Sequence, residues 1–159
     1  PDHRAPVWKA MEHCLEQGWV KSIGVSNYGP SHLEAMKAYA TYMPSVNQVE
    51  FNPWLQRPEL KRATEAAGAK VMAYSPLARG HKVNDKALEK IAIELDCTPA
   101  QVAIKFCYDE GCITIPKSSN PKRIVENIAS LEVDISSHYE EIKALECNYV
   151  SGWDPTTEP

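Results

Sequence analysis

The sequence predicts an α/β fold in which the chain forms half of a (β/α)8 barrel. Helical and strand patterns alternate along its 159 residues, which is typical of βαβ units and a parallel sheet. That alternation alone is equally compatible with a small doubly wound sheet. However, polar residues gather at the C-terminal end of each predicted strand, where barrel enzymes build their sites, and a phosphate-binding pattern follows the last strand. We therefore expect the barrel, with these strands as its fifth to eighth.

The first part of the chain contains three of the predicted strands. Val7, Trp8 and Leu15 recur at helical spacing in an opening helix, and Gly18 is placed to end it. The elements that follow are a strand at residues 20–25, a helix begun by a capping box of Ser31 and Glu34, a strand at 46–51, a helix from Pro58 to Gly68, and a strand at 70–74.

The second part adds four helices and one strand. These are a helix at residues 85–95, a helix from the capping box of Thr98 and Gln101 to Gly111, a strand at 112–115, a helix at 120–130, and a last helix begun by Ser137 and Glu140. We assign residues 1–148 to the half barrel of four βα units plus a final helix, and residues 149–159 to an irregular tail.

Residues 115–127 have the sequence pattern of an anion-binding site. Asn120 is a suitable N-cap and Pro121 suits the first helical position, so we expect free N–H groups in the first turn to meet phosphate oxygens. Lys117, Lys122 and Arg123 add positive charge there. A solvated helix start with ordinary surface lysines explains the same residues, and this motif alone does not separate the two interpretations.

Composition excludes several classes of protein. The net charge is -4 with no block of like charges, which argues against nucleic acid or a membrane surface as partner. The five cysteines form no CxxC pair and have no histidine at ligand spacing, so we expect no metal site and reduced thiols, as in the cytoplasm. No signal peptide or membrane-spanning apolar stretch is evident.

Five short motifs occur in a recognisable order: Gly24-Val25-Ser26-Asn27-Tyr28, Asn47-Gln48-Val49-Glu50, Ala73-Tyr74-Ser75-Pro76-Leu77, Thr98-Pro99-Ala100-Gln101 and Ile115-Pro116-Lys117-Ser118. In order and approximate spacing they resemble the second half of the aldo-keto reductase family, over nearly the whole chain. The resemblance implies a barrel that binds NADPH across its C-terminal face and transfers hydride to an aldehyde or ketone. It also implies a complete enzyme that is monomeric.

The resemblance assigns a role to each matching residue. Ser26, Asn27 and Gln48 would hold the nicotinamide carboxamide, and Tyr74 would stack beneath the ring. The nucleotide's remaining contacts would be Ser75, Leu77 and Arg79 along the pyrophosphate, Lys117, Ser118 and Arg123 at the 2′-phosphate, and Glu126 and Asn127 at the adenine. Two cations match the extra phosphate dianion and favour NADPH over NADH. Trp54 either lines substrate space or is a packed rim residue.

The family's catalytic tyrosine, aspartate, lysine and histidine belong to the first half of the barrel. No tyrosine here lies in a matching motif, so we assign no catalytic residue to this chain and expect the 159 residues alone to be inactive. Four strands also leave two open sheet edges, so we expect the first half of the barrel as a partner. The alternatives are a self-associating half barrel and a non-catalytic relative that binds the nucleotide.

Overall fold

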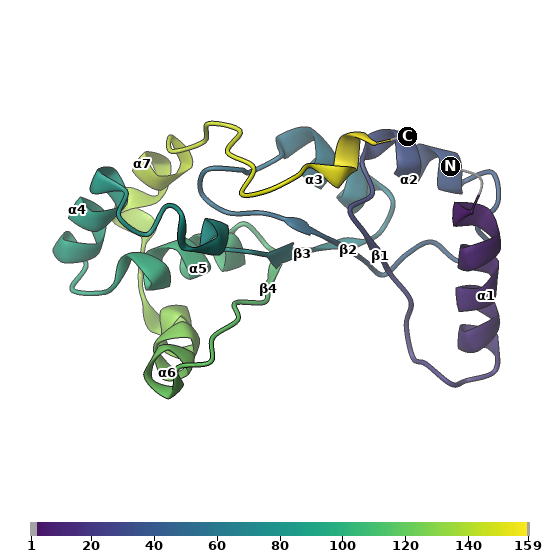
Figure 1. Cartoon of the computed structure of the whole chain (residues 1–159), viewed down its shortest axis with the longest axis horizontal. Coiled ribbons are helices and arrows are strands. Elements are labelled where there is room, and N and C mark those ends of the chain that lie inside the picture. Colours follow the sequence, from purple (N-terminus) through teal and green to yellow (C-terminus); the bar gives the residue numbers. More distant parts are fainter. Residues whose placement is uncertain (1–2, 159) are drawn as a thin grey trace. The chain divides into compact units, whose positions relative to one another are not determined.

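The computed structural model describes residues 3–158 and confirms alternating strands and helices (Figure 1). The four strands are β1 (Val25–Ser26), β2 (Val46–Glu50), β3 (Lys70–Tyr74) and β4 (Ile113–Thr114). They follow the order β1-β2-β3-β4. β1 pairs in parallel with β2, and β3 pairs in parallel with β4, with Met72 opposite Ile113. This order is the one expected of successive βα units.

The described chain forms two compact units. The first unit contains the residues up to Val49, Pro58–Val71 and the residues from Asp154 onwards; the second contains Glu50–Arg57 and Met72–Trp153. The prediction of a half barrel at 1–148 followed by a tail at 149–159 therefore stays a prediction about the complete fold.

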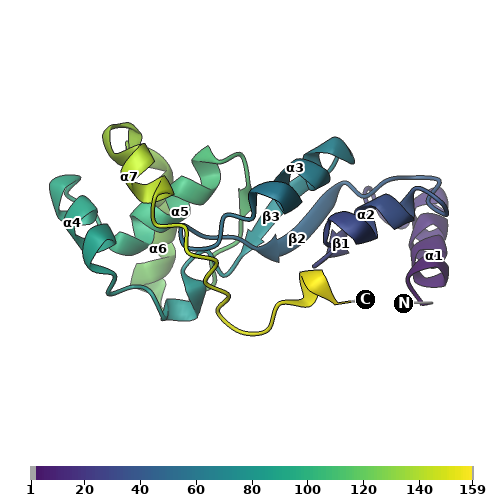
Figure 2. The same cartoon turned by 90° about the horizontal axis from the view of Figure 1, so that it is seen from above.

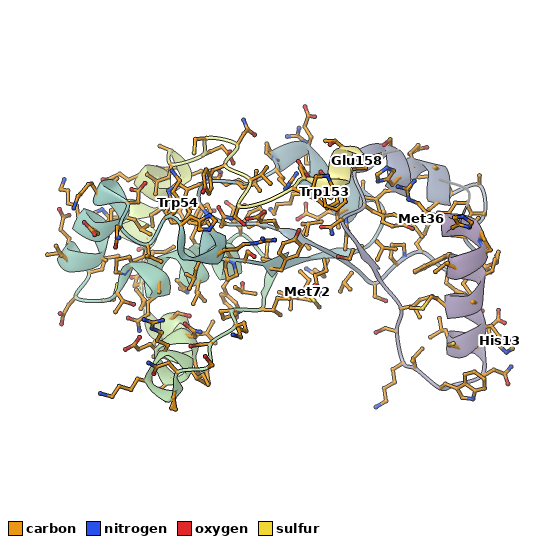
Figure 3. The ribbon with its side chains drawn as sticks, in the orientation of Figure 1. His13, Met36, Trp54, Met72, Trp153 and Glu158 are labelled. Atoms are coloured by element: carbon orange, nitrogen blue, oxygen red, sulfur yellow. The ribbon has the colours of Figure 1, made fainter. Side chains whose placement is uncertain are left out.

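Three helices belong to the first unit: α1 (Arg4–Glu16), α2 (Pro30–Met36) and α3 (Pro58–Ala66). Trp8 of α1 and Leu33 and Met36 of α2 pack with Ile23 and Val25 in a buried apolar cluster. Met36 of this cluster is labelled in Figure 3. The Trp8 indole also donates a hydrogen bond to the Tyr42 carbonyl at 3.1 Å. Trp8 and Leu15 of the opening helix thus face one core, whereas Val7, which the same pattern contained, is 61% exposed.

The second unit contains α4 (Lys86–Glu94), α5 (Pro99–Asp109), α6 (Pro121–Ala129) and α7 (Tyr139–Lys143). α5 contacts α4, α6 and β4, and Figure 2 shows α4, α6 and α7 grouped around it. Val102, Phe106 and Cys107 of α5 are completely buried. The predicted capping box of α5 is confirmed, because Thr98 exchanges hydrogen bonds with Gln101. α4 also has an N-cap, Asp85, whose side chain accepts the N–H groups of Ala87 and Leu88.

Two predicted helix starts are wrong. α2 begins at Pro30, because Gly29 is its N-cap and donates its N–H to Nδ1 of His32 at 3.0 Å. A β-carbon at residue 29 would lie 2.1 Å from the Thr156 carbonyl oxygen, so only glycine fits there. Ser137 lies inside a 3-10 turn at Ser136–His138, and α7 begins only at Tyr139.

The outer strands are shorter than predicted. Of the predicted strand at 20–25, only Val25 belongs to β1. Residues 20–22 are exposed, and the first hydrogen bond to the neighbouring segment is the one that the Ser45 N–H donates to the Ile23 carbonyl. β4 covers two of the four predicted residues. Within the tail, Pro155–Thr157 form a 3-10 turn, and Pro159 lies outside the described residues.

Candidate functional site

A cavity of about 730 Å³ lies in the second unit, beside the ends of β3 and β4. Its walls come from the segment after β3, the segment after β4, the start of α5 and the first two turns of α6. Nine of the predicted cofactor-binding residues line it: Tyr74, Ser75, Leu77, Arg79, Lys117, Ser118, Arg123, Glu126 and Asn127. Residues from two distant stretches of sequence are thereby brought to one site.

The segment after β3 presents its side chains to the cavity in an unusual backbone conformation. Ser75, Ala78 and Arg79 have φ values of 49°, 45° and 54°, in the left-handed region. Non-glycine residues held there cost about 1–3 kcal/mol each and persist only when their surroundings fix them. The Ala78 N–H donates to the Ser75 carbonyl at 2.9 Å, and the Gly80 N–H donates to the Leu77 carbonyl at 2.7 Å. This tight turn directs Leu77 and Arg79 to the cavity wall.

The start of α6 is built differently from the prediction. Asn120 is the N-cap as expected, but its side chain accepts the Lys122 N–H at 2.9 Å. The N–H of Asn120 itself donates to the Ser118 hydroxyl at 3.1 Å, and Pro121 carries no N–H. The expectation of free N–H groups throughout the first turn is therefore wrong, because the cap and the preceding serine already satisfy most of them. An anion here would depend on side-chain charge.

Side-chain charge at the cavity is mainly positive. Its lining contains three positively charged side chains, those of Arg79, Lys117 and Arg123, and one carboxylate, that of Glu126. Lys117 and Arg123 are exposed, while Glu126 is half-buried. The local balance therefore attracts anions although the whole chain carries a net charge of -4.

Sequence reasoning missed one wall of the cavity. Val83 and the residues Thr98–Ala100 also line it, and the latter form the beginning of α5. The signal was present, because Thr98 was identified as a helix cap, and helices of parallel α/β folds begin near the carboxyl ends of strands, where ligands bind. Both α5 and α6 thus begin at this cavity.

The other three predicted cofactor residues lie together in the first unit. Ser26 and Gln48 are directly opposite in the β1–β2 ladder, and the Ser26 hydroxyl donates to the Gln48 carbonyl at 2.9 Å. The Asn27 N–H donates to the same carbonyl at 2.9 Å. The fully buried amide of this strand is the neighbouring Asn47, which bonds to Tyr28 and Thr64, whereas Gln48 is only half-buried. Gln48 thus keeps part of its side chain accessible.

Trp54 is buried within the second unit. Trp54, labelled in Figure 3, is 2% exposed, and its indole N–H donates to Oδ2 of Asp85 at 3.1 Å. It is not among the residues that line the cavity. The structure therefore favours a packed tryptophan, and contact with substrate remains a prediction.

No group of three or more histidine, cysteine, aspartate or glutamate side chains within residues 3–158 is arranged to hold a metal ion. Over the same residues, no helix has both the length and the apolar character that crossing a membrane requires.

The sequence profile of the Aldo/keto reductase family matches residues 1–146. This chain belongs to the aldo-keto reductase family. An uncharacterised oxidoreductase of Schizosaccharomyces pombe is 37% identical over 158 residues, covering 98% of this chain and 58% of that protein. Aldose reductase B of Dictyostelium discoideum is 40% identical over 145 residues, covering 89% of this chain and 47% of that protein.

Solved aldo-keto reductase structures share the fold. The apo crystal structure of Gox0644 has a TM-score of 0.87 and 35% identity, covering 96% of this chain and 57% of that one. An aldo-keto reductase from a Medee basin deep-sea metagenome also reaches a TM-score of 0.87, at 29% identity. The α/β fold thus matches aldo-keto reductase barrels over about half of their length, and the chain spans about half the length of the curated relatives it matches.

Proposed function

We propose that this chain is the NADPH-binding second half of an aldo-keto reductase barrel, whose complete form reduces aldehydes or ketones to alcohols. The observation that carries the proposal is the cavity of the second unit, where nine residues assigned to the nucleotide meet. The cavity volume of about 730 Å³ falls in the range of small-molecule sites. Family membership supports the oxidoreductase class.

The donor set fits an anionic nucleotide. Lys117 and Arg123 would bind the 2′-phosphate, Arg79 the pyrophosphate, and Glu126 and Asn127 the adenine. A guanidinium and an ammonium together match a phosphate dianion in charge and hydrogen-bond donors. The 2′-phosphate site thus rests on side chains, because the N-cap of α6 occupies most of the backbone donors of the first turn.

Residues of the first unit would hold the reactive end of the cofactor. Ser26 and Asn27, at the end of β1, meet Gln48 in the middle of β2 and would with it orient the carboxamide, since an amide needs both a donor and an acceptor. Tyr74 would support the nicotinamide ring by stacking. When bound, NADPH supplies the hydride, and a proton donor from the first half of the barrel would complete the reduction.

An apolar surface in the second unit supports a partner for β4. A second cavity, of about 830 Å³, lies along β4 and α6. Exposed isoleucine and leucine side chains line it: Ile113, Ile124, Ile128 and Leu131. Contiguous exposed apolar residues of this kind mark interaction surfaces, and β4 ends the strand order. We propose that the first half of the barrel covers this surface and that the complete enzyme is monomeric. We also propose a cytoplasmic location, with which the free cysteines are compatible.

The test is NADPH titration of the natural full-length protein, followed by quenching of tryptophan fluorescence, together with a screen of small aldehydes and ketones for NADPH oxidation. We expect saturable quenching and turnover of at least one carbonyl compound. Saturable quenching without turnover would support the non-catalytic alternative. Absence of quenching would contradict the nucleotide-binding proposal.

A further inference from the structure

We propose that the tail segment, residues 147–152, fixes the position of the Arg79 loop, residues 78–83, and that Tyr149 and Gly152 are positioning residues for the Arg79 side chain. The Arg79 loop supplies Arg79, Gly80 and Val83 to the wall of the cavity. The inference rests on the proposed nucleotide function and concerns how long the nucleotide stays bound.

Tyr149 contacts two consecutive residues of the Arg79 loop. Its hydroxyl lies 3.0 Å from Nδ1 of His81, and the two rings meet edge to face with centroids 6.4 Å apart. The Lys82 ammonium lies over the same tyrosine ring, 4.6 Å from its centroid, at a cation–π distance. One tail side chain therefore holds the loop through a hydrogen bond, a ring contact and a charge.

Gly152 lies against the Arg79 guanidinium. A β-carbon at residue 152 would be 3.1 Å from Nη1 and 3.2 Å from Cζ of Arg79. These distances are shorter than ordinary van der Waals contact, so any larger residue would push the guanidinium aside. The backbone of the Arg79 loop would not have to move, because only the flexible end of the arginine is involved. Gly152 thus sets where the charge of Arg79 lies.

The tail segment is anchored to buried residues. The Ser151 N–H lies 3.2 and 3.3 Å from the two carboxylate oxygens of Glu50, which is 2% exposed. The Tyr149 N–H donates to the carbonyl of buried Trp54 at 2.9 Å. Because these anchors lie at the end of β2 and in the segment after it, the tail segment can hold the Arg79 loop in a fixed place.

The Arg79 loop needs such support. Ala78 and Arg79 both have positive φ, a conformation that persists only when neighbouring groups enforce it. Arg79 lines the cavity with the other two cations, so its placement affects how strongly an anion is held there. Changes in such a contact act mainly on the dissociation rate. We therefore expect the tail segment to control the release of NADPH.

The experiment compares Tyr149→Leu, Tyr149→Phe and Gly152→Ala in the natural full-length protein. Tyr42→Leu is the matched control, because Tyr42 is a partly exposed tyrosine of the other unit. NADPH release is measured by stopped-flow fluorescence, and hydrogen exchange is measured at the Gly80 and His81 amides, which close the turn of the loop. The release measurements are repeated with each substitution combined with Arg79→Ala.

Tyr149→Leu should speed hydrogen exchange at both amides. Tyr149→Leu and Gly152→Ala should each raise the rate of NADPH release by about three- to tenfold, which corresponds to the loss of one hydrogen-bonding contact. Tyr149→Phe should have a smaller effect, because it keeps the ring under Lys82. Both effects on release should disappear in the Arg79→Ala background. Unchanged amide exchange in Tyr149→Leu, or equal effects with and without Arg79, would overturn the inference. Absence of NADPH binding in the unmodified protein would overturn both the proposed nucleotide function and the proposed control of NADPH release. Hydrogen exchange at the Gly80 and His81 amides would still decide whether the tail segment holds the Arg79 loop.

Discussion

Lys117 and Arg123 line the same cavity, Lys117 from the segment after β4 and Arg123 from the first turn of α6. The Asn120 cap lies between them in sequence and holds the turn that brings them together. Since the cap and Ser118 take up backbone N–H groups, the positive charge of these two side chains is the main attraction for a phosphate at this site. If the proposed function is right, specificity for a 2′-phosphorylated nucleotide should therefore depend on these two side chains.

Replacing Arg123 with alanine should weaken NADPH far more than NADH. Loss of one charge-assisted contact to the 2′-phosphate should cost about 1–3 kcal/mol of binding free energy for NADPH. Dissociation constants for both nucleotides, measured by fluorescence titration, give the comparison. Lys122→Ala is the matched control, because Lys122 is a cation of the same turn that does not line the cavity. Equal weakening of NADPH and NADH by Arg123→Ala would contradict the assignment.

Much of this architecture follows from local sequence rules. The predicted third strand, residues 70–74, coincides with β3, and Asp85, Thr98 and Asn120 are helix caps in or beside the predicted positions. These features depend on neighbouring residues, through periodicity and capping chemistry. The gathering of nine predicted residues around one cavity also follows from their positions after parallel strands.

The errors occur where distant residues decide the local structure. The start of α2 depends on the close approach of Thr156 to Gly29, more than a hundred positions away in the chain. Such a tertiary contact leaves no pattern in a single sequence. The missed wall of the cavity is a different case, because the helix cap at Thr98 could be predicted from the sequence, whereas its place at the cavity depends on how α5 packs.

Trp54→Phe should destabilise the protein without changing substrate affinity. The substitution removes the hydrogen bond to Asp85 from a buried site, which should lower the free energy of unfolding by about 1–2 kcal/mol. Urea unfolding followed by circular dichroism measures the loss. Asp85→Asn, which keeps an oxygen acceptor for the indole and the α4 cap, serves as the conservative comparison. A raised KM for carbonyl substrates with unchanged stability would instead place Trp54 in the substrate site.

Glu12 should make the first unit sensitive to acid. Burial raises its pKa, but hydrogen bonds from Lys9, Tyr42 and Thr41 outweigh this effect and lower the pKa from 4.5 to about 2. A carboxyl group with a lowered folded pKa contributes stability that is fully present above pH 4.5 and is lost as the pH falls towards 2. Glu12→Gln should therefore destabilise the protein most above pH 4.5, and the difference should shrink towards pH 2. A difference independent of pH over this range would contradict the role given to the carboxylate.

The cysteines should differ in reactivity. Burial strongly raises the pKa of the Cys107 thiol, with further contributions from Cys112 and Glu110, and this residue is completely buried. Cys147 is exposed. Because the thiolate is the reactive species, iodoacetamide at pH 8 should alkylate Cys147 in the native protein and leave Cys107 unmodified. Peptide mass spectrometry distinguishes the two sites, and modification of Cys107 before unfolding would contradict the burial seen here.

A crystal structure of the natural full-length protein with NADP+ is the most direct test of nucleotide binding at this cavity. We expect the 2′-phosphate to lie within hydrogen-bonding distance of Lys117 and Arg123, with the adenine against Glu126 and Asn127. A nucleotide bound elsewhere, or a 2′-phosphate in solvent away from both cations, would contradict it.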